Sequence, residues 1–374
     1  MFTLHDCNKY IQSAATASRD ILFSLKIMEA NISYLLERYA NQTLLKGMTN
    51  ASNATPYPFA ISCLFGTTAA TLLANCGVLS LFIINKSLRT PFNVYIMALL
   101  SANIVFVAVD GPLKLLTYPY PDWRLGAAVC TLRIYTVYII AAMAIHFHLL
   151  ITLNRAWAMF WPLSYRKYHS TAVAWWVSGV TVFYLHVLLL PGILLDAVYY
   201  RIPVEKGCWL DSSPQFAWAT FTSWLVFIVP KVFIPICYPL LWRKEMRRRR
   251  RIVAAQQFAE LTMTSTPPVP ADMATATTRP QRSHLRPFIV LTLFTISIIV
   301  CWMPSLMYYQ LLNFVSMDRL KTFGKVADIL YSLQGLLDPV FVCLSLSKVY
   351  HHVMRLGRMC GTCQVAQQKD AAEH

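Results

Sequence analysis

The chain has 374 residues, of which 56% are hydrophobic and only 13% are charged. An ordinary soluble protein carries about 25% charged residues, so this composition excludes a typical soluble domain and predicts an integral membrane protein. The formal net charge of +16 would suit nucleic-acid binding only if the basic residues formed one solvent-exposed patch.

Residues 1–57 form a polar leader in front of the first long apolar stretch. Four Asn-X-Ser/Thr sequences cluster in this leader, which predicts a glycosylated extracellular segment. The acceptors are Asn31, Asn41, Asn50 and Asn53. Asp6 and Lys9 interrupt the start of the chain, so no cleavable signal peptide is visible, and we expect the first apolar stretch to direct insertion.

Seven apolar stretches follow, each long enough to cross the roughly 30 Å hydrocarbon layer as a helix of about 20 residues. They cover approximately residues 59–84, 91–116, 129–154, 171–195, 215–242, 286–313 and 323–347. We therefore predict an all-α integral membrane protein with a seven-transmembrane helix bundle at residues 58–347. The fifth helix is expected to extend into the basic run 243–251, which lacks Gly and Pro. The inner loop at about 243–285 is otherwise predicted to be basic and disordered, because residues 262–282 are rich in Pro, Thr, Ala and Ser.

The basic residues lie unevenly on the two sides that this topology defines. Of the 33 Lys and Arg residues, 19 fall in the first, third and fifth connections and in the tail, against 11 in the leader and the other connections. Segments rich in Lys and Arg stay in the cytoplasm. The distribution predicts a multi-pass plasma-membrane protein with its N-terminus outside. Nucleic-acid binding is therefore not expected. The basic run 243–251 would either contact lipid headgroups or contact a partner protein directly, and the sequence leaves both roles open.

The cysteines divide by position. Cys130, at the top of the third span, and Cys208, in the loop before the fifth, both face the oxidising outer side, which favours a disulfide between them. Cys360 and Cys363 lie in the predicted cytoplasmic segment 348–374. We expect a short amphipathic helix there after the last span, with acylation of both thiols anchoring it to the membrane.

Polar and proline landmarks recur at characteristic distances along the seven stretches. They are Asn75 in the first, Arg155 lying 25 residues after Cys130, Pro230 lying eight residues before Tyr238, Trp302 and Pro304 in the sixth, and Asp338 and Pro339 in the seventh. A proline removes a backbone donor and kinks a helix, which creates places for bistable bending inside a bundle. From residue 60 to residue 363, these landmarks resemble the rhodopsin-like class of G-protein-coupled receptors.

The resemblance implies a receptor that transmits a ligand signal to a heterotrimeric G protein, with arrestin and membrane lipid as further partners. It assigns the G-protein contact to Arg155. Trp302 and Pro304 would form the switch that lets the sixth helix swing its inner end. Nothing in the sequence suggests an enzyme, a cofactor or a metal site.

Two departures from the family pattern act in opposite directions. Asn154 replaces the acid beside Arg155, so we expect basal signalling, because the family uses that carboxylate to help hold the arginine inactive. Val342 replaces a seventh-span tyrosine. The hydrogen bond that this tyrosine would give Tyr238 in the active state is therefore missing.

A third departure concerns the family's sodium-binding residues. The second-span acid aligns with Asn103, and the seventh-span asparagine aligns with Asp338, so the pair looks exchanged. One carboxylate remains between these helices, where Asn75 and water can solvate it. We expect sodium sensitivity to be weakened.

The predicted ligand cavity combines charged and aromatic side chains near the outer face. Its candidate residues are Asp110, Lys114, Arg133, Val137, Tyr138, Tyr308, Tyr309, Asp328 and Tyr331. Val137 stands where amine receptors carry an acid, and Ser332 stands where opsins carry the retinal lysine, so neither ligand is expected. A mixed-charge aromatic cavity suits a short peptide, such as a neuropeptide, better than a lipid. A polar small molecule would use the same groups.

Two alternatives stay open from the sequence. Asp110 and Lys114, four residues apart, would also satisfy each other as an ion pair. The charged residues inside spans would also suit the pathway of a seven-helix transporter or channel, although the two halves of the chain show no repeat. Lys231, beside Pro230, has no assigned role.

Overall fold

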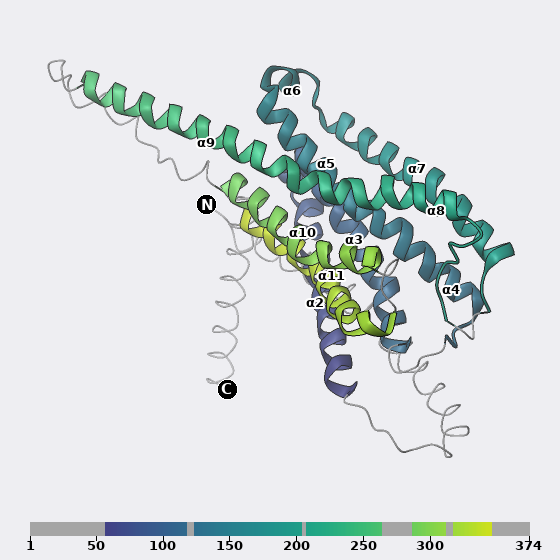
Figure 1. The fold of residues 1–374 in the computed structure, drawn as a ribbon. Coiled ribbons are helices and arrows are strands. Elements are labelled where there is room, and N and C mark those ends of the chain that lie inside the picture. The colour runs from purple at the N-terminus through teal and green to yellow at the C-terminus, as the bar shows by residue number, and fades with distance from the viewer. Residues whose placement is uncertain (1–56, 118–122, 204–206, 264–285, 312–316, 346–374) are drawn as a thin grey trace, which may run out of the picture.

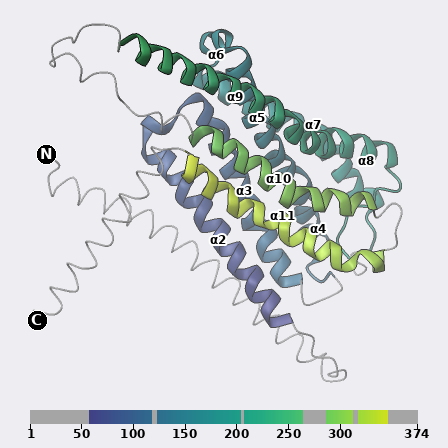
Figure 2. The ribbon, with the colours of Figure 1, turned by 60° about the vertical axis from the view of Figure 1, so that its left-hand side comes forward.

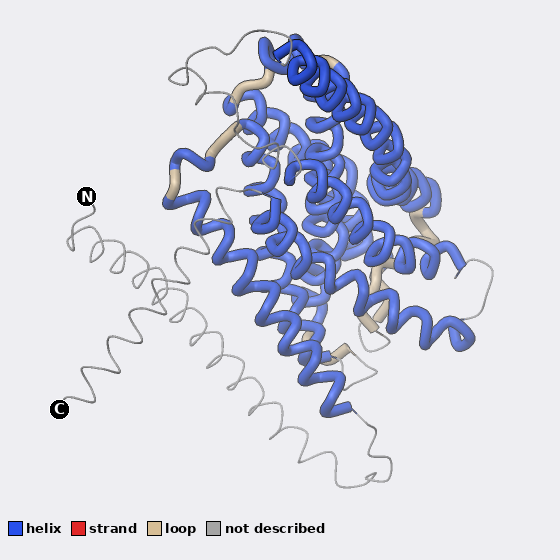
Figure 3. The backbone as a smooth tube through the Cα atoms, turned by 90° about the vertical axis from the view of Figure 1, so that its left-hand side faces the viewer, coloured by secondary structure: helices blue, strands red, loops and turns tan. Residues whose placement is uncertain are grey.

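The computed structural model describes residues 57–117, 123–203, 207–263, 286–311 and 317–345. Seven long helical rods run through these residues and pack into one bundle (Figure 1). The connections between them that are described are short (Figure 3). The four glycosylation acceptors, Cys360, Cys363 and the amphipathic helix expected after the last span lie outside the described residues.

Several rods are composed of more than one helical segment. The first and second are α2 (Tyr57–Ile84) and α3 (Pro91–Thr117), joined through η1 (Lys86–Leu88). The third comprises α4 (Gly126–Tyr135), η2 (Thr136–Ile140) and α5 (Ala141–Phe160), and α6 (Pro162–Tyr168) follows it. The fourth comprises α7 (Thr171–Leu195) and η3 (Asp196–Tyr200), and the fifth comprises α8 (Phe216–Thr222), η5 (Ser223–Ile228) and α9 (Val229–Met263). The last two are α10 (Arg286–Leu311) and α11 (Met317–Ser345).

The rods have the length and apolar surface of membrane spans. In the part of the chain that is described, six helices are long and apolar enough to cross a bilayer, and α10 holds a shorter apolar stretch, Thr292–Tyr308. Large apolar side chains cover the outside of the bundle. Trp176 is 73% exposed and Phe183 is 70% exposed, which water would disfavour and lipid accommodates.

The bundle interior contains an apolar layer and a buried polar layer. Phe82, Leu99 and Phe147, from α2, α3 and α5, are at most 2% exposed and share one core cluster. The α11 helix packs along α10 and α2, as Figure 2 shows. This arrangement brings the polar residues of α2, α3 and α11 together inside the bundle.

Three rods contain a π-helical segment: η2, η3 and η5. A π turn accommodates an extra residue, so it changes which later side chains face the bundle. η2 and η5 lie in the third and fifth rods and both supply residues to the cavity described below. These two π-helical segments therefore help to determine which side chains of the third and fifth rods face the cavity.

The fifth helix differs most from the sequence prediction. We predicted helix through residue 251 and disorder in the rest of the loop to 285, but α9 continues to Met263 and projects beyond the bundle (Figure 1). Residues 243–263 contain no Gly or Pro, and Glu245 pairs with Arg249 at 3.1 Å along the helix. Good helix formers and an i,i+4 ion pair keep this segment helical. The third rod is also longer than 129–154, spanning 126–160.

Candidate functional site

A cavity of about 310 Å³ lies among the second, third, fifth, sixth and seventh rods. Its charged lining residues are Asp110, Lys114, Arg133, Lys231 and Asp328. Its aromatic walls are Phe106, Tyr138, Phe227 and Tyr331. Pockets that bind small ligands combine apolar walls with a few placed polar groups in this way.

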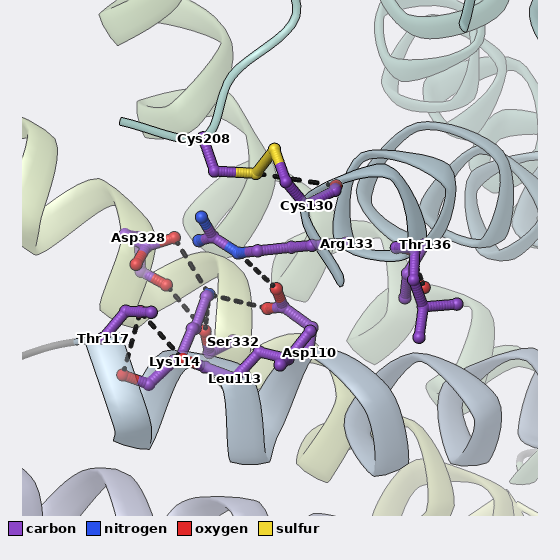
Figure 4. A network of polar contacts seen from close by, with 11 residues as sticks. Asp110, Leu113, Lys114, Thr117, Cys130, Arg133, Thr136, Cys208, Asp328 and Ser332 are labelled. Atoms are coloured by element: carbon purple, nitrogen blue, oxygen red, sulfur yellow. Dashed lines mark hydrogen bonds and ion pairs between the residues drawn. A yellow bond between two sulfur atoms is a disulfide. The ribbon is translucent and has the colours of Figure 1, made fainter. Parts of the chain in front are cut away.

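An ion network ties three rods together at this cavity (Figure 4). Asp110 is only 1% exposed, and it pairs with Lys114 at 3.3 Å and with Arg133 at 3.4 Å. Lys114 also pairs with Asp328 of α11 at 3.2 Å. Asp110 and Lys114 therefore form the ion pair that the sequence allowed, and both also line the cavity. The pair can be structural and can contact a ligand at the same time.

Most residues predicted from the sequence for ligand binding meet at the cavity. Seven of the nine line it: Asp110, Lys114, Arg133, Val137, Tyr138, Asp328 and Tyr331. Tyr308 instead packs against Phe323, with ring centroids 6.3 Å apart. The side chain of Tyr309 lies outside the described residues.

The sequence prediction did not include Lys231, Phe227 or two serines, Ser223 and Ser305, all of which line the cavity. A usable signal was present for Lys231, because an ionisable residue inside a span usually faces a cavity or a partner. Its Nζ atom lies 5.9 Å from the Phe227 ring centroid and 5.8 Å from that of Tyr331.

The predicted disulfide is present above the cavity. Cys130 and Cys208 are bonded, with their Cα atoms 5.6 Å apart. The bond holds the segment before α8 against α4, one turn from Arg133. Asp196 and Arg201 form a neighbouring ion pair at 2.5 Å, and the backbone N–H of Asp211 donates to Asp196. The ends of the third, fourth and fifth rods that lie near the disulfide are thereby linked.

A second, smaller cavity of about 60 Å³ extends from the ion network toward the bundle centre. It shares Asp110 and Lys114 with the larger cavity and is also lined by Asn103, Trp302 and Gln334. Polar residues therefore continue from the outer cavity to the buried polar layer.

Asp338 occupies the centre of that layer and is 1% exposed. Its carboxylate accepts hydrogen bonds from Asn103 at 2.8 Å and from Gln334 at 2.7 Å, and it lies 3.2 Å from His148 Nε2. Asn75 donates to the carbonyl of Gly335 at 2.8 Å. Asn103 and Asp338, the exchanged pair of the sequence analysis, are thus in direct contact.

Trp302 connects this layer to the sixth rod. It is 3% exposed, and its ring stands edge-on to His148 with centroids 5.0 Å apart. Pro304 and Pro339 lie inside α10 and α11. Pro230 lies in the first turn of α9, directly after the π-helical segment η5.

Asn154, near the α6 end of the third rod, binds α6 and its C-cap residue His169 rather than Arg155. Its amide donates to His169 Nε2 at 2.8 Å and accepts from the Tyr165 hydroxyl at 3.1 Å. Burial lowers the pKa of His169, so the neutral acceptor form is favoured. Burial also raises the pKa of Tyr165, and the nearby charge of Arg155 opposes that rise.

Arg155 rests on an aromatic ring. Its guanidinium carbon lies 3.7 Å from the ring centroid of Phe92 on α3, and the described ion pairs do not include it. Tyr238 donates to Thr292 of α10 at 2.9 Å, while Val342 is fully buried in the core. Tyr238 therefore binds the sixth rod in this conformation.

Among the described residues, no group of three His, Cys, Asp or Glu side chains is arranged to hold a metal ion. The site as described is a cavity with charged and aromatic walls, connected through Trp302 and Asp338 to the inner half of the bundle.

Comparison with known families gives one match that covers most of the chain. A family model described as "7 transmembrane receptor (rhodopsin family)" matches residues 74–341. This range begins in α2 and ends in α11, so it includes the cavity, the Asp338 layer and Arg155.

Individual relatives are distant. The chain is 25% identical over 245 residues to "Rhodopsin, GQ-coupled" of Mizuhopecten yessoensis, covering 62% of this chain and 46% of that protein. It is 24% identical over 246 residues to the human melatonin receptor type 1B, covering 64% and 60%. It is 27% identical over 195 residues to the human muscarinic acetylcholine receptor M1, covering 51% and 42%. The matched regions thus span between 42% and 60% of these relatives.

Proposed function

Because the chain belongs to the rhodopsin family of seven-transmembrane receptors, we propose that it transmits the binding of an extracellular ligand to a heterotrimeric G protein at the plasma membrane. Receptors of this family are not enzymes. In this proposal the glycosylated N-terminal segment is extracellular and the tail, acylated at Cys360 and Cys363, is cytoplasmic. Arrestin and membrane lipid are further partners.

The continuity of the two cavities supports this proposal most directly. The larger one offers a ligand both charges and aromatic walls, and the smaller one leads from Asp110 to Trp302 and Gln334. Gln334 donates to Asp338, and Trp302 packs on His148. A ligand that moves Asp110 would therefore also affect Trp302 and Gln334, which line the same small cavity. Gln334 in turn contacts Asp338, the centre of the buried polar layer.

The inner end of the bundle supplies the output. Swinging α10 outward breaks the Tyr238–Thr292 hydrogen bond and exposes Arg155 to a G protein. A ligand can shift this equilibrium only by its difference in affinity for the two conformations. Because Asn154 binds α6 and its flanking His169 instead of opposing Arg155, we expect measurable signalling without ligand.

The choice of ligand rests on the cavity's chemistry. Val137 lines it at the position where amine receptors carry an acid, and Ser332 is hydrogen bonded within α11 instead of being a lysine. We therefore propose neither a biogenic amine nor retinal. A short peptide or a polar small molecule suits the charged and aromatic lining, and the peptide remains our preference.

Nucleotide exchange on purified G proteins tests the proposal. The full-length chain in lipid nanodiscs should accelerate GTP binding to at least one of a panel of heterotrimers, relative to empty nanodiscs. Currents or solute flux through proteoliposomes of the same protein, with no exchange on any heterotrimer, would instead favour the transporter or channel.

A further inference from the structure

The larger cavity carries an unbalanced positive charge. Three cations, Lys114, Arg133 and Lys231, and two carboxylates, Asp110 and Asp328, line it, which leaves a formal charge of +1. The carboxylates already pair with Lys114 and Arg133. Lys231 is therefore the residue to which the excess charge belongs.

Lys231 has no anionic partner in the part of the chain that the structure describes. It is 6% exposed, and its described contacts are the faces of Phe227 and Tyr331. Burying an ammonium carries a large desolvation cost, and the two cation–π contacts, with centroids near the limit of about 6 Å for that interaction, offset only part of it. The two rings therefore leave much of the cost uncompensated, which an anion in the cavity would offset.

We infer that the ligand carries a carboxylate and that Lys231 binds it. This inference rests on the proposed function of the cavity as a ligand site and narrows the class of ligand. The hydroxyls of Ser223 and Ser305 line the same cavity and can donate further hydrogen bonds to a carboxylate. Phe227 and Tyr331 flank the ammonium and would pack against an apolar group next to the acid.

The carboxylate has two possible sources with the same chemistry: a free organic acid, or the C-terminus of a short peptide. A cavity of about 310 Å³ lies at the small end of ligand pockets, which hold roughly 300–1,000 Å³. It accommodates a small aromatic acid or the last residue of a peptide. Two pairs of probe compounds distinguish a free acid from a peptide C-terminus. Each pair compares a carboxylic acid with its uncharged amide.

The experiment measures thermal stability of the full-length chain in nanodiscs with 3-phenylpropionate, N-acetylphenylalanine and the two corresponding amides. Ligands that bind the folded state raise the melting temperature by mass action. We expect at least one acid to bind about tenfold or more tightly than its amide, as a charge-assisted hydrogen bond provides. An effect of N-acetylphenylalanine alone identifies a peptide terminus, and an effect of phenylpropionate alone identifies a free acid.

Variants assign the effect to Lys231. Lys231→Met should abolish the preference for the acid over its amide, and Lys231→Arg should keep it. If Lys231→Met does not reach the membrane, Lys231→Gln takes its place. Lys244→Met is the matched control, because Lys244 also lies in α9 and also contacts an aromatic ring, that of Phe160, at 4.2 Å.

Either of two results overturns the inference: no acid stabilises the wild type more than its amide, or the preference survives in Lys231→Met. Without any probe, Lys231→Met should also melt at a higher temperature than wild type, since it removes an uncompensated buried charge, whereas Lys244→Met should not. The assay contains no G protein. A failure of G-protein coupling would therefore leave its outcome unaffected.

Discussion

At the scale of single residues, the exchanged pair Asn103 and Asp338 defines the polar centre. One carboxylate between the second and seventh rods can be buried because it receives hydrogen bonds from two amides and lies beside His148. A buried charge without such donors would be strongly destabilising. The direct contact of Asn103 with Asp338 is consistent with the exchange that the resemblance predicted, in which a single acid beside an amide is retained.

Asp338→Ala should lower the free energy of unfolding by about 3 kcal/mol, because the buried amides of Asn103 and Gln334 each lose their shorter hydrogen bond. They keep only the longer ones, to Asn75 and Ser297. Melting temperature in detergent measures the loss. The double variant Asn103→Asp with Asp338→Asn restores one acid beside one amide, so it should be more stable than the sum of the single changes predicts. Strictly additive losses would show that the two positions do not act as a pair.

At the scale of elements, the contact between α7 and α8 depends on the absence of a side chain at Gly192. A Cβ atom there would overlap the ring of Trp218, which is fixed because its indole N–H donates to the carbonyl of Leu188 at 2.9 Å. A rigid ring cannot move aside as a flexible chain can. The fourth and fifth rods therefore approach closely at this point.

Gly192→Ala should destabilise the receptor by about 1–3 kcal/mol, the usual cost of overpacking, and lower its surface expression. Gly179→Ala is the control in the same helix, since a Cβ at Gly179 meets no atom within 4 Å. Alanine also has the better helix propensity, so that variant should melt at or above the wild-type temperature. Equal losses in both variants would contradict the packing argument.

The inner helix α6 should respond to acid through His169. Burial lowers the pKa of His169 from its ordinary value of 6.5, so the folded chain binds fewer protons than the unfolded chain in that range. Stability from this group is complete above the ordinary value and is lost as pH falls through the lowered one. When His169 is protonated, its Nε2 becomes a donor and can no longer accept the hydrogen bond from the Asn154 amide. The hydroxyl of Tyr95 and the ring of Tyr165 also lie against this imidazole.

Hydrogen exchange measures this response. After correction for intrinsic rates, protection of the α6 amides should fall between about pH 7.5 and about pH 5.5 in the wild type. It should stay constant in His169→Gln, whose side chain does not titrate. The same loss in both proteins would place the acid response elsewhere.

The elements also show what the sequence could predict. Hydropathy located the helical rods. The high cost of ionisable groups inside spans pointed to Asp110, Lys114 and Asp328, and these residues do line one cavity. Lys231 was left without a role because its cavity forms only where five rods pack together, which the hydropathy of a single span does not record. The partners of Asn154 were missed because they depend on how the chain turns into α6, which no periodicity records.

At the scale of the whole molecule, the smaller cavity joins the charged cavity to the buried polar layer around Asp338, and Arg155 lies farther along the third rod. The helix count could be predicted because each span must satisfy its own backbone hydrogen bonds in lipid. The extension of α9 into residues 243–251 could be predicted because that run lacks Gly and Pro, but its end at Met263 could not. The end depends on a balance between helix propensity and the competition of water for backbone hydrogen bonds. That projecting helix and Arg155 define the inner surface that we assign to the G protein.

Ligand-free G-protein dissociation in cells, measured across a panel of alpha subunits, tests the proposed coupling through Arg155. Wild type, Arg155→Ala and Arg124→Ala would be compared at matched surface expression, with Arg124 as an exposed arginine before α4. We predict basal activity for one alpha subunit in wild type and Arg124→Ala, reduced roughly tenfold in Arg155→Ala, a typical coupling energy. No basal activity in wild type, or activity that Arg155→Ala leaves unchanged, would contradict the account.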